Sequence, residues 1–253
     1  MLKSLQLALV ACSIALEIDA FVVRTTQHHL VNQRRHEQKL FMASEKSWTS
    51  ILEGFDDNSP VQKSVIEEGD GEIPARGSTV EIEYVGVIGK SQIAWGVDDV
   101  IEGWLKNLQG LYDVLEGPFR ENNIDGEVIF DDEKFTEAFL SEDLGIANKI
   151  QCKKTIMAAK RLRVGSDEYP EGTEFDSSFE RNKNYEFVLG NGKAIKAMDL
   201  LVSTMSVGEK AKVICRSDYG YGSEGYRKAN GDVVVPPFAT LCFTVTLVSS
   251  SSA

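Results

Sequence analysis

The chain has 253 residues, of which 42% are apolar and 26% charged, so it is long enough for one large or two small hydrophobic cores. Its formal net charge of -12 at pH 7 argues against nucleic acid and anionic membrane surfaces as partners, and no apolar run is long enough to span a membrane. These properties predict a globular protein with two folded units.

The first 44 residues have the composition of targeting segments. Residues 1–20 combine an early lysine, an apolar run from Leu5 to Leu16 and the small residue Ala20, which is the layout of a signal peptide. Residues 21–44 are basic, as in a transit peptide. Together they resemble the bipartite leader of algae with secondary plastids, which predicts a plastid location. An ordinary secreted protein with a basic pro-segment is the alternative.

The same leader contains every histidine of the chain, at positions 28, 29 and 36. A processed chain would have none, which excludes Ser-His or Cys-His catalysis and histidine-ligated metals, so we expect no metal and no cofactor. The other cysteines, Cys152, Cys215 and Cys242, are too far apart in sequence for a zinc or dithiol motif. We expect them to be buried thiols, with a Cys215–Cys242 disulfide as the alternative.

Beyond the leader, residues 45–60 are polar and are predicted to be a linker. Residues 61–88 predict two strands around a turn, because Ile82, Tyr84 and Ile88 alternate with other residues. From Trp95 the apolar spacing becomes helical. The strand pattern resumes only after Gly172, with a strand, a short helix, another strand and a final strand in the segment "VVVPPFATLCFTVTLV".

Seven motifs follow in order along these strand-forming parts: "GDG", "Y-x-G", "G-T-x-F-D-S-S", "F-x-L-G", "M-x-V-G-E-K-A", "Y-G-Y-G" and "V-P-P-x-A-T-L-x-F-x-V-x-L". The ordered set resembles an FKBP-type peptidyl-prolyl isomerase domain, split between residues 61–89 and 172–248, with 249–253 as a tail. The resemblance implies an α+β fold in which a curved antiparallel sheet wraps around one short helix. It also implies isomerisation of X-Pro bonds in proline-containing clients.

The resemblance further implies a set of site residues. Those around the prolyl ring would be catalytic: Tyr84, Phe175, Asp176, Tyr221 and Phe243. Those that bind the rest of the substrate would be Tyr185, Ala194, Ile195, Met198 and Val235. Tyr221 would donate its hydroxyl to a substrate carbonyl, the Ile195 amide would hold a second carbonyl, and Val235 would close the loop over the site. Arg181 and the Tyr84 hydroxyl would hold the carboxylate of Asp176.

Two features depart from the best-known family members. Met198 stands where those members have a tryptophan floor, which predicts a softer apolar floor and weaker binding of rigid macrolides. The loop at residues 222–237 is also longer than in minimal members. Tyr84 or Phe243 taken alone could be plain core residues. The alternative function is therefore a proline-binding scaffold or chaperone with little or no turnover.

Residues 90–171 stand where a hairpin loop of a few residues is expected, and an insert of this size needs its own core. The spacing predicts an all-α bundle with helices at 97–108, 112–119, 133–139 and 148–162.

Motifs in this insert, from "W-G-V-D-D-V-x-x-x-W-L" through "DLGI" to "K-K-x-I-x-x-A-x-x-L", resemble a sterile alpha motif (SAM) domain. An unrelated helical bundle is the alternative. The resemblance implies a protein-interaction module that binds a partner or a second copy of the chain. An acidic middle, Asp131 to Glu137, and a basic last helix with Lys149, Lys153, Lys154, Lys160, Arg161 and Arg163 fit such pairing, although a solvated basic face explains the helix equally well.

Overall fold

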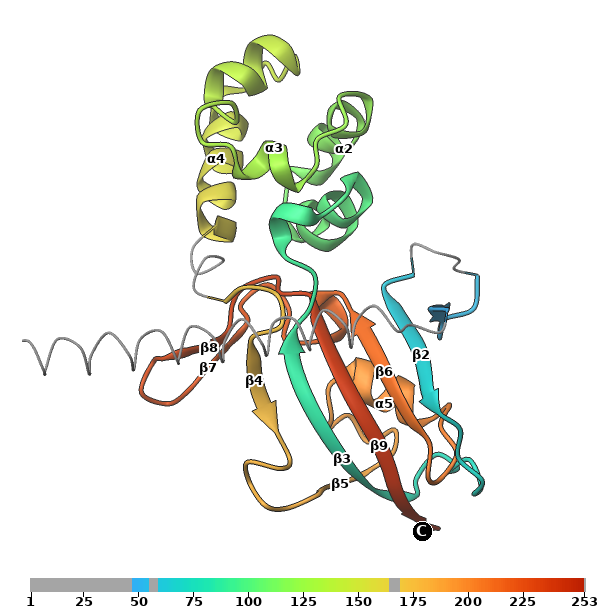
Figure 1. Ribbon diagram of the computed structural model, residues 1–253. Coiled ribbons are helices and arrows are strands. Elements are labelled where there is room, and N and C mark those ends of the chain that lie inside the picture. The colour runs from blue at the N-terminus through green and yellow to red at the C-terminus, as the bar shows by residue number, and fades with distance from the viewer. Residues whose placement is uncertain (1–46, 55–58, 164–168, 253) are drawn as a thin grey trace, which may run out of the picture. The chain divides into compact units, whose positions relative to one another are not determined.

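The computed structural model describes residues 47–54, 59–163 and 169–252, which form an antiparallel sheet with a short helix and a group of helices inserted between two strands (Figure 1). The predicted signal peptide and transit-like segment, residues 1–44, lie outside the described residues. Within the described ranges, no helix has the length and hydropathy that a membrane span requires.

The sheet contains seven strands, and all of its pairings are antiparallel. Its order is β1-β2-β6-β9-β3-β4, with β5 paired to the first half of β3. The central pair is β3 and β9, which pair from Thr79 opposite Ser251 to Ile88 opposite Leu241, with one register shift between Glu81 and Ile82. The strands are β1 (Thr49–Ser50), β2 (Val61–Glu67), β3 (Thr79–Ile88), β4 (Glu174–Ser177), β5 (Tyr185–Val188), β6 (Lys210–Cys215) and β9 (Leu241–Ser251).

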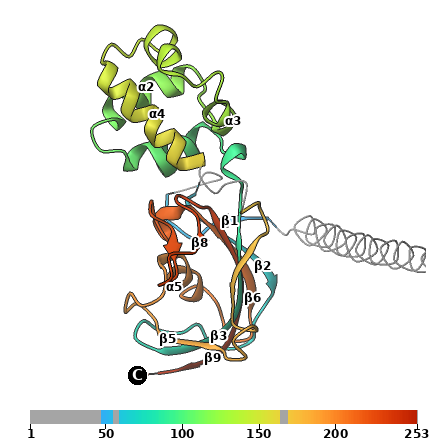
Figure 2. The same cartoon turned by 90° about the vertical axis from the view of Figure 1, so that its left-hand side faces the viewer.

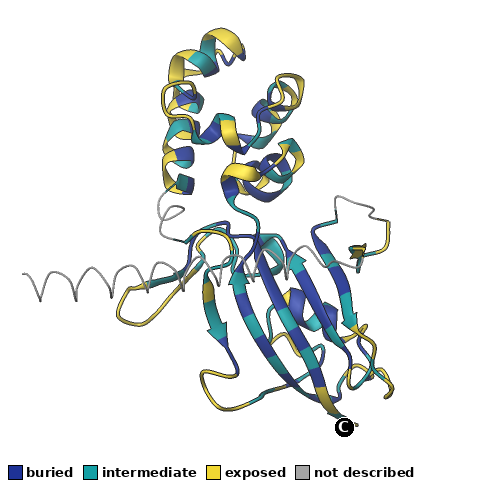
Figure 3. Cartoon of the chain, viewed as in Figure 1, coloured by how far each residue is buried: buried dark blue, intermediate teal, exposed yellow. Residues whose placement is uncertain are grey.

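Alternating burial along these strands builds the first of two hydrophobic cores, which we call the host core. In β3 every second residue is buried, including Val80, Ile82 and Tyr84, and in β9 the same alternation runs from Phe243 to Leu247 (Figure 3). Helix α5 (Lys196–Val202) covers one face of the curved sheet, as Figure 2 shows, and adds Leu201 to the core. The mixed α and β architecture with an antiparallel sheet agrees with the predicted fold class.

The sheet extends further at both ends than the residue pattern predicts. Strand β1 lies inside the predicted linker 45–60, where the Thr49 hydroxyl donates to the Lys63 carbonyl at 3.3 Å. Strand β9 continues through the serine run that was predicted to be a tail, and Ser251 pairs with Thr79. Backbone hydrogen bonds need no apolar side chain, so polar segments can lengthen a sheet without any alternation in the sequence.

The insert connects β3 to β4 and has a second hydrophobic core, which we call the insert core. Its largest fully buried side chains include Trp104, Leu115 and Phe119. The elements of the insert are η1 (Gln92–Ala94), η2 (Asp99–Trp104), η3 (Leu105–Asn107), α2 (Tyr112–Glu121), α3 (Gly126–Phe130), η4 (Phe139–Asp143) and α4 (Lys149–Arg163). Its two ends meet in the sheet, because the Ile88 amide donates to the Thr173 carbonyl at 2.8 Å and the Gly172 amide to the Ile88 carbonyl at 2.7 Å.

Three of the four predicted helices are present in the insert, although the first is a π-helix followed by a 3-10 turn. The helix predicted at 133–139 is wrong over residues 133–136. There the Asp131 carboxylate accepts the amides of Glu133 and Lys134, each at 3.0 Å, and holds a turn, so the helical residues begin only at Glu137, just before η4. The short helix α3 was not predicted; the Asp125 carboxylate caps it by accepting the Val128 amide at 2.9 Å.

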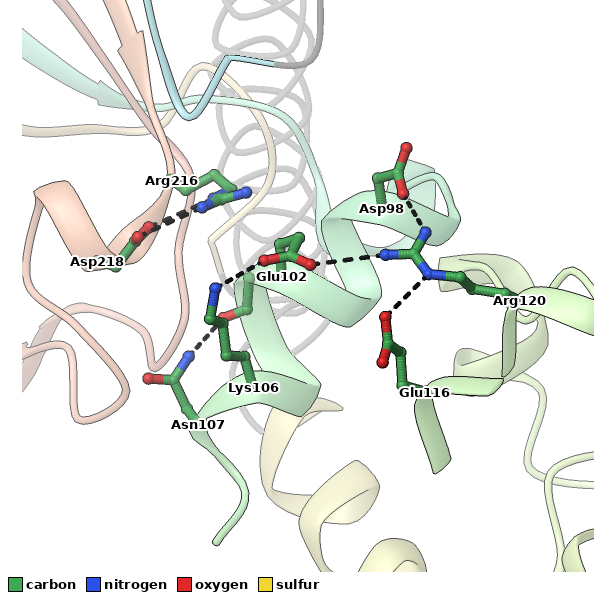
Figure 4. A network of polar contacts seen from close by, with 9 residues as sticks. Asp98, Glu102, Lys106, Asn107, Glu116, Arg120, Arg216 and Asp218 are labelled. Atoms are coloured by element: carbon green, nitrogen blue, oxygen red, sulfur yellow. Dashed lines mark hydrogen bonds and ion pairs between the residues drawn. The ribbon is translucent and has the colours of Figure 1, made fainter. Parts of the chain in front are cut away.

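A cluster of ion pairs joins the first helical segments of the insert. Arg120 of α2 contacts the carboxylates of Asp98, Glu116 and Glu102 at 2.6, 3.2 and 3.5 Å (Figure 4). All of these side chains are at least a quarter exposed, where ion pairs contribute little to stability. The fold of the insert therefore rests on its apolar core.

Candidate active site

Six aromatic side chains form a continuous line of ring contacts at the edge of the host core. The ring centroids are 6.1 Å apart for Tyr185 and Tyr84, 6.3 Å for Tyr84 and Phe243, and 5.6 Å for Phe243 and Phe175. The line continues through Tyr221, 6.1 Å from Phe175, to Tyr226, 5.5 Å further on. We call these residues the aromatic cluster: Tyr84, Phe175, Tyr185, Tyr221, Tyr226 and Phe243.

Strand register brings the middle of the cluster together. Gly86 of β3 pairs with Phe243 of β9 on one side and with Asp176 of β4 on the other. A Cβ at position 86 would lie 2.7 Å from Phe243 Cε1 and 2.9 Å from Phe175 Cζ, closer than side chains approach one another. The two rings therefore occupy the space that a larger residue at position 86 would need.

The carboxylate of Asp176 is held beside the cluster by two partners. The Tyr84 hydroxyl donates to Asp176 Oδ2 at 2.6 Å, and Arg181 Nη1 lies 3.2 Å from Asp176 Oδ1. The Arg181 guanidinium also donates to the Tyr84 hydroxyl and lies over the Tyr84 ring, 5.5 Å from its centroid. These are the two partners expected from the sequence. The Asp176 side chain is 32% exposed, so one edge of the paired carboxylate remains accessible.

The phenols of Tyr84 and Tyr221 stay protonated at neutral pH. Burial raises the pKa of Tyr84 well above its ordinary value, and the hydrogen bond to Asp176 raises it further. Burial, and then the charge of Asp176, raise the pKa of Tyr221 to about 12. Both side chains are therefore hydroxyl donors throughout the physiological pH range.

The remaining predicted residues lie in the same host core. Met198 of α5 is 3% exposed, and Val235 is 1% exposed in β8 (Val233–Val235), which pairs with β7 (Tyr226–Arg227). Ala194 and Ile195 pack against the core in front of α5, where Ile195 is the N-cap residue with extended backbone. Nine of the predicted catalytic and substrate-binding residues thus belong to one apolar region. The tenth, Asp176, borders this region through its hydrogen bond with Tyr84.

Sequence reasoning missed three contributors to this site. Tyr226 stacks on Tyr221, but the sequence around it has no periodicity, so nothing in its spacing predicts the contact. Gly86 was part of a motif, yet its role depends on rings that come from two other strands. Ser178 accepts the Tyr84 amide at 2.9 Å with its hydroxyl and donates its own amide to the Tyr84 carbonyl at 3.0 Å, which fixes the backbone beside the cluster.

The chemistry of the described residues is that of a binding surface for an apolar group with a few polar edges. Cys152, Cys215 and Cys242 are buried thiols, and burial raises the pKa of the Cys215 thiol, which keeps it protonated. In the part of the chain that the structure describes, no three His, Cys, Asp or Glu side chains are grouped to hold a metal ion. The polar groups available to a ligand at this site are therefore the hydroxyls of Tyr84 and Tyr221 and the paired carboxylate of Asp176, beside the aromatic rings.

Comparisons with known proteins relate this chain to one family. Residues 152–248 match the family model of the FKBP-type peptidyl-prolyl cis-trans isomerase. The chain is 46% identical over 78 residues to "Peptidyl-prolyl cis-trans isomerase Fkbp12" of Drosophila melanogaster, covering 31% of this chain and 68% of that protein. It is 45% identical over 78 residues to "FK506-binding protein 1A" of Emericella nidulans, again covering 31% and 68%.

Longer proteins also match over the same part. "Peptidyl-prolyl cis-trans isomerase FKBP4" of Homo sapiens is 44% identical over 77 residues, which are 30% of this chain and 16% of the human protein. Among solved structures, "N-terminal domain of FKBP42 from Arabidopsis thaliana" aligns with 82% of this chain and 94% of its own, with a TM-score of 0.42 and 17% identity. On the identity to the Drosophila protein over more than two thirds of its length, the chain belongs to the FKBP-type peptidyl-prolyl cis-trans isomerase family.

Proposed function

We propose that this chain is a peptidyl-prolyl cis-trans isomerase and that the aromatic cluster is where it binds the prolyl ring of a client. The observation that carries the proposal is the Tyr84–Asp176–Arg181 contact set at the edge of this cluster, in which Tyr84 and Asp176 lie on adjacent strands and Arg181 lies in the turn after β4. It combines an apolar surface for a proline ring with polar edges whose charges are partnered.

Rotation about an X-Pro amide is slow because it breaks the amide resonance, at a barrier of roughly 18–20 kcal/mol. The twisted amide has a less dipolar carbonyl than the planar one and loses less when water is removed. An apolar site that excludes water therefore favours the twisted state over the planar, hydrated ground state. No nucleophile, metal or cofactor is needed for this step, so the proposed chemistry requires only the side chains described above.

Each polar group has a role in this scheme. The Tyr221 hydroxyl donates to one substrate carbonyl, and the backbone amide of Ile195 donates to a second. Asp176, with its charge shared between Tyr84 and Arg181, presents an accessible oxygen edge in the apolar wall. Met198 forms the apolar floor, and Val235 in β8 borders the site from the loop.

Two substitutions test this proposal in a protease-coupled assay of an X-Pro peptide. Asp176→Val and Tyr221→Phe should each lower kcat/KM by tenfold or more, on the order of one lost charge-assisted or hydroxyl hydrogen bond. Tyr112→Phe is the matched control, because it removes a tyrosine hydroxyl from the insert, outside the aromatic cluster. An intact chain that binds proline peptides without accelerating their isomerisation would support the alternative, a proline-binding scaffold.

For the insert we propose a protein-interaction module of the SAM type. Lys153, Lys154 and Arg161 of α4 are exposed, and so are Ile150 and Met157 on the same helix, each 66% exposed. The acidic segment at 131–137 is exposed apart from Phe135 and Thr136. This polarity supports binding to an acidic partner or to a second copy of the chain.

Arg163 does not contribute to the basic surface as predicted, because its guanidinium contacts Asp132 and the Ile129 carbonyl within the insert. Its side chain is only 14% exposed.

Charge reversal by Lys153→Glu should reduce complex formation in sedimentation experiments, whereas Lys183→Glu, on the host side, should not. A wild-type chain that stays monomeric at high concentration and captures no acidic partner would refute the module.

We also propose that residues 1–44 direct the chain to a plastid. Support comes from the composition of this leader alone. A fusion of residues 1–44 to a fluorescent protein should accumulate in the plastid of an alga with a secondary plastid. Accumulation in the secretory pathway would favour the alternative.

A further inference from the structure

The loop that carries part of the aromatic cluster is anchored in the insert core. Phe238 closes this loop, since its amide donates to the Gly222 carbonyl at 3.1 Å. Yet its side chain, 7% exposed, belongs to the insert core, whose other buried members all lie between Trp95 and Leu162. Phe238 is the point at which residues 222–238, here called the site loop, join the second fold.

The backbone of Phe238 indicates that this anchorage is maintained by its ring. Its φ of 58° lies in the left-handed region, which bulky residues rarely adopt. Such a conformation persists only where the surroundings determine it. Here the constraint is the burial of the phenyl ring among insert residues. Without the ring, nothing in the insert core would hold Phe238 in this backbone conformation.

Two further contacts hold the end of the site loop, and the residues directly after it, to the insert. The Gln92 side-chain amide, which is buried, donates to the Pro237 carbonyl at 2.8 Å. The Trp95 indole donates to the Thr240 hydroxyl at 3.3 Å. Gln92 and Trp95 lie at the start of the insert, in and just after η1, so the first turn of the insert contacts the chain at the end of the site loop and two residues beyond it.

The other part of the site loop contacts the aromatic cluster. Tyr226 pairs through its backbone with Val235, and its ring stacks on Tyr221 at 5.5 Å and 28°. Gly225 fits tightly against the same hairpin, because a Cβ there would lie 2.2 Å from the Val235 carbonyl oxygen. A shift of Pro237 and Phe238 would therefore move Val235 and Tyr226 with them, and both of these residues border the proposed prolyl site.

We propose that Phe238, Gln92 and Trp95 are positioning residues through which the insert holds the site loop closed on the aromatic cluster. The proposal rests on the proposed function of that cluster. When the anchor is weakened, fewer molecules hold the loop in the binding conformation, and the apparent dissociation constant rises by the inverse of that fraction. Bound substrate restores the closed loop, so KM rises while kcat changes little.

The same coupling acts in reverse. Whatever stabilises the closed loop must also stabilise the anchored insert, because coupling between two sites is reciprocal. A proline peptide bound at the cluster should then slow hydrogen exchange in the insert, for example at the Gly126 amide, which donates to the Trp95 carbonyl at 2.9 Å. A protein bound to the insert would in turn change the affinity of the cluster for its client.

The test compares Phe238→Ala with Phe135→Ala in the full chain. Both variants remove a buried phenyl ring from the insert core, but Phe135 is not part of the site loop. Phe238→Ala should raise KM roughly tenfold, the expected result if the competent fraction falls tenfold, with kcat within about twofold of the wild type. Phe135→Ala should leave KM unchanged, and Phe238→Leu, which keeps an apolar anchor, should recover most of the affinity.

A second variant keeps the proposal falsifiable if Phe238→Ala does not fold. Gln92→Met preserves the side-chain volume and removes only the hydrogen bond to Pro237, so it should raise KM in the same direction by a smaller factor. Equal KM values for wild type, Phe238→Ala and Gln92→Met, or an equal rise in Phe135→Ala, would overturn the coupling. A wild-type chain without turnover would instead overturn the proposed function.

Discussion

Substitution of Gly86 by alanine is the most direct test of how the aromatic cluster is packed. The added methyl group would lie 2.7 Å from Phe243 Cε1 and 2.9 Å from Phe175 Cζ. An ordinary contact begins at 3.4 Å, so the Phe243 ring must retreat by about 0.7 Å. It cannot swing away easily, because it contacts Phe175 on one side and Tyr84 on the other.

Overpacking of this kind in a well-packed core costs about 1–3 kcal/mol of the free energy of unfolding. The effect on catalysis should be larger, since a displacement approaching 1 Å at a reacting site lowers the rate by roughly a hundredfold. We therefore expect Gly86→Ala to lower kcat/KM by tenfold to a hundredfold or so and to reduce the urea midpoint.

Gly117→Ala provides the matched control. Gly117 lies inside α2, where nothing lies within 4 Å of an added Cβ, and alanine is the better helix former. This variant should be as stable as the wild type or more so, with unchanged turnover. Wild-type kcat/KM and stability in Gly86→Ala would refute the packing that we infer at the centre of the site.

Three further predictions concern stability and the rim of the site. Lys63 and Glu209 form a buried ion pair at 2.6 Å, so Lys63→Met, which leaves the carboxylate without its cation, should lower the free energy of unfolding by about 3–5 kcal/mol. In urea titrations the double variant Lys63→Met/Glu209→Met should recover much of this loss, and additive losses would contradict the prediction. The pKa of Tyr221 is raised from 10.0 to about 12 in the folded chain, because the folded state favours the protonated phenol. The contribution of this phenol to stability is therefore complete below pH 10 and is lost as the pH rises through 12. Urea midpoints should then fall more steeply across this window in the wild type than in Tyr221→Phe, and parallel curves would exclude the effect. Tyr226→Ala should raise KM about two- to tenfold by removing a ring contact of about 0.5–1.5 kcal/mol, whereas Tyr226→Phe should behave as the wild type in peptide turnover; an equal effect of both variants would point to the hydroxyl instead.

The sequence pattern predicts the parts of the fold whose side chains alternate with the backbone. In β3, the spacing of Ile82 and Tyr84 predicts both the strand and its buried face, and the structure confirms both predictions. The serine residues at the end of β9 carry no such alternation, so the strand appears shorter in the sequence than it is. The turn at Asp131 was missed for a related reason, because a single carboxylate that accepts two amides overrides helical spacing around it.

The site shows the same limit in another form. Asp176 and Arg181 are close in the sequence, and their contact with Tyr84 could be expected from the family resemblance. Phe238 could not be placed in this way. Its spacing in the chain indicates a host residue, whereas its ring is buried in the insert core, and only the assembled structure brings those partners together.

The position of the insert also determines the order in which the sheet can form during synthesis. Strand β3 leaves the ribosome with its three partners, β4, β5 and β9, still unmade, and roughly 85 residues separate it from β4. At about 5–20 residues per second, β3 waits about 4–17 s for its nearest partner strand. Charges such as Glu81 and Glu83, which alternate with its apolar residues, oppose the pairing of an unpaired strand with other chains. The two glutamates thus stand on the strand whose unpaired interval the insert lengthens.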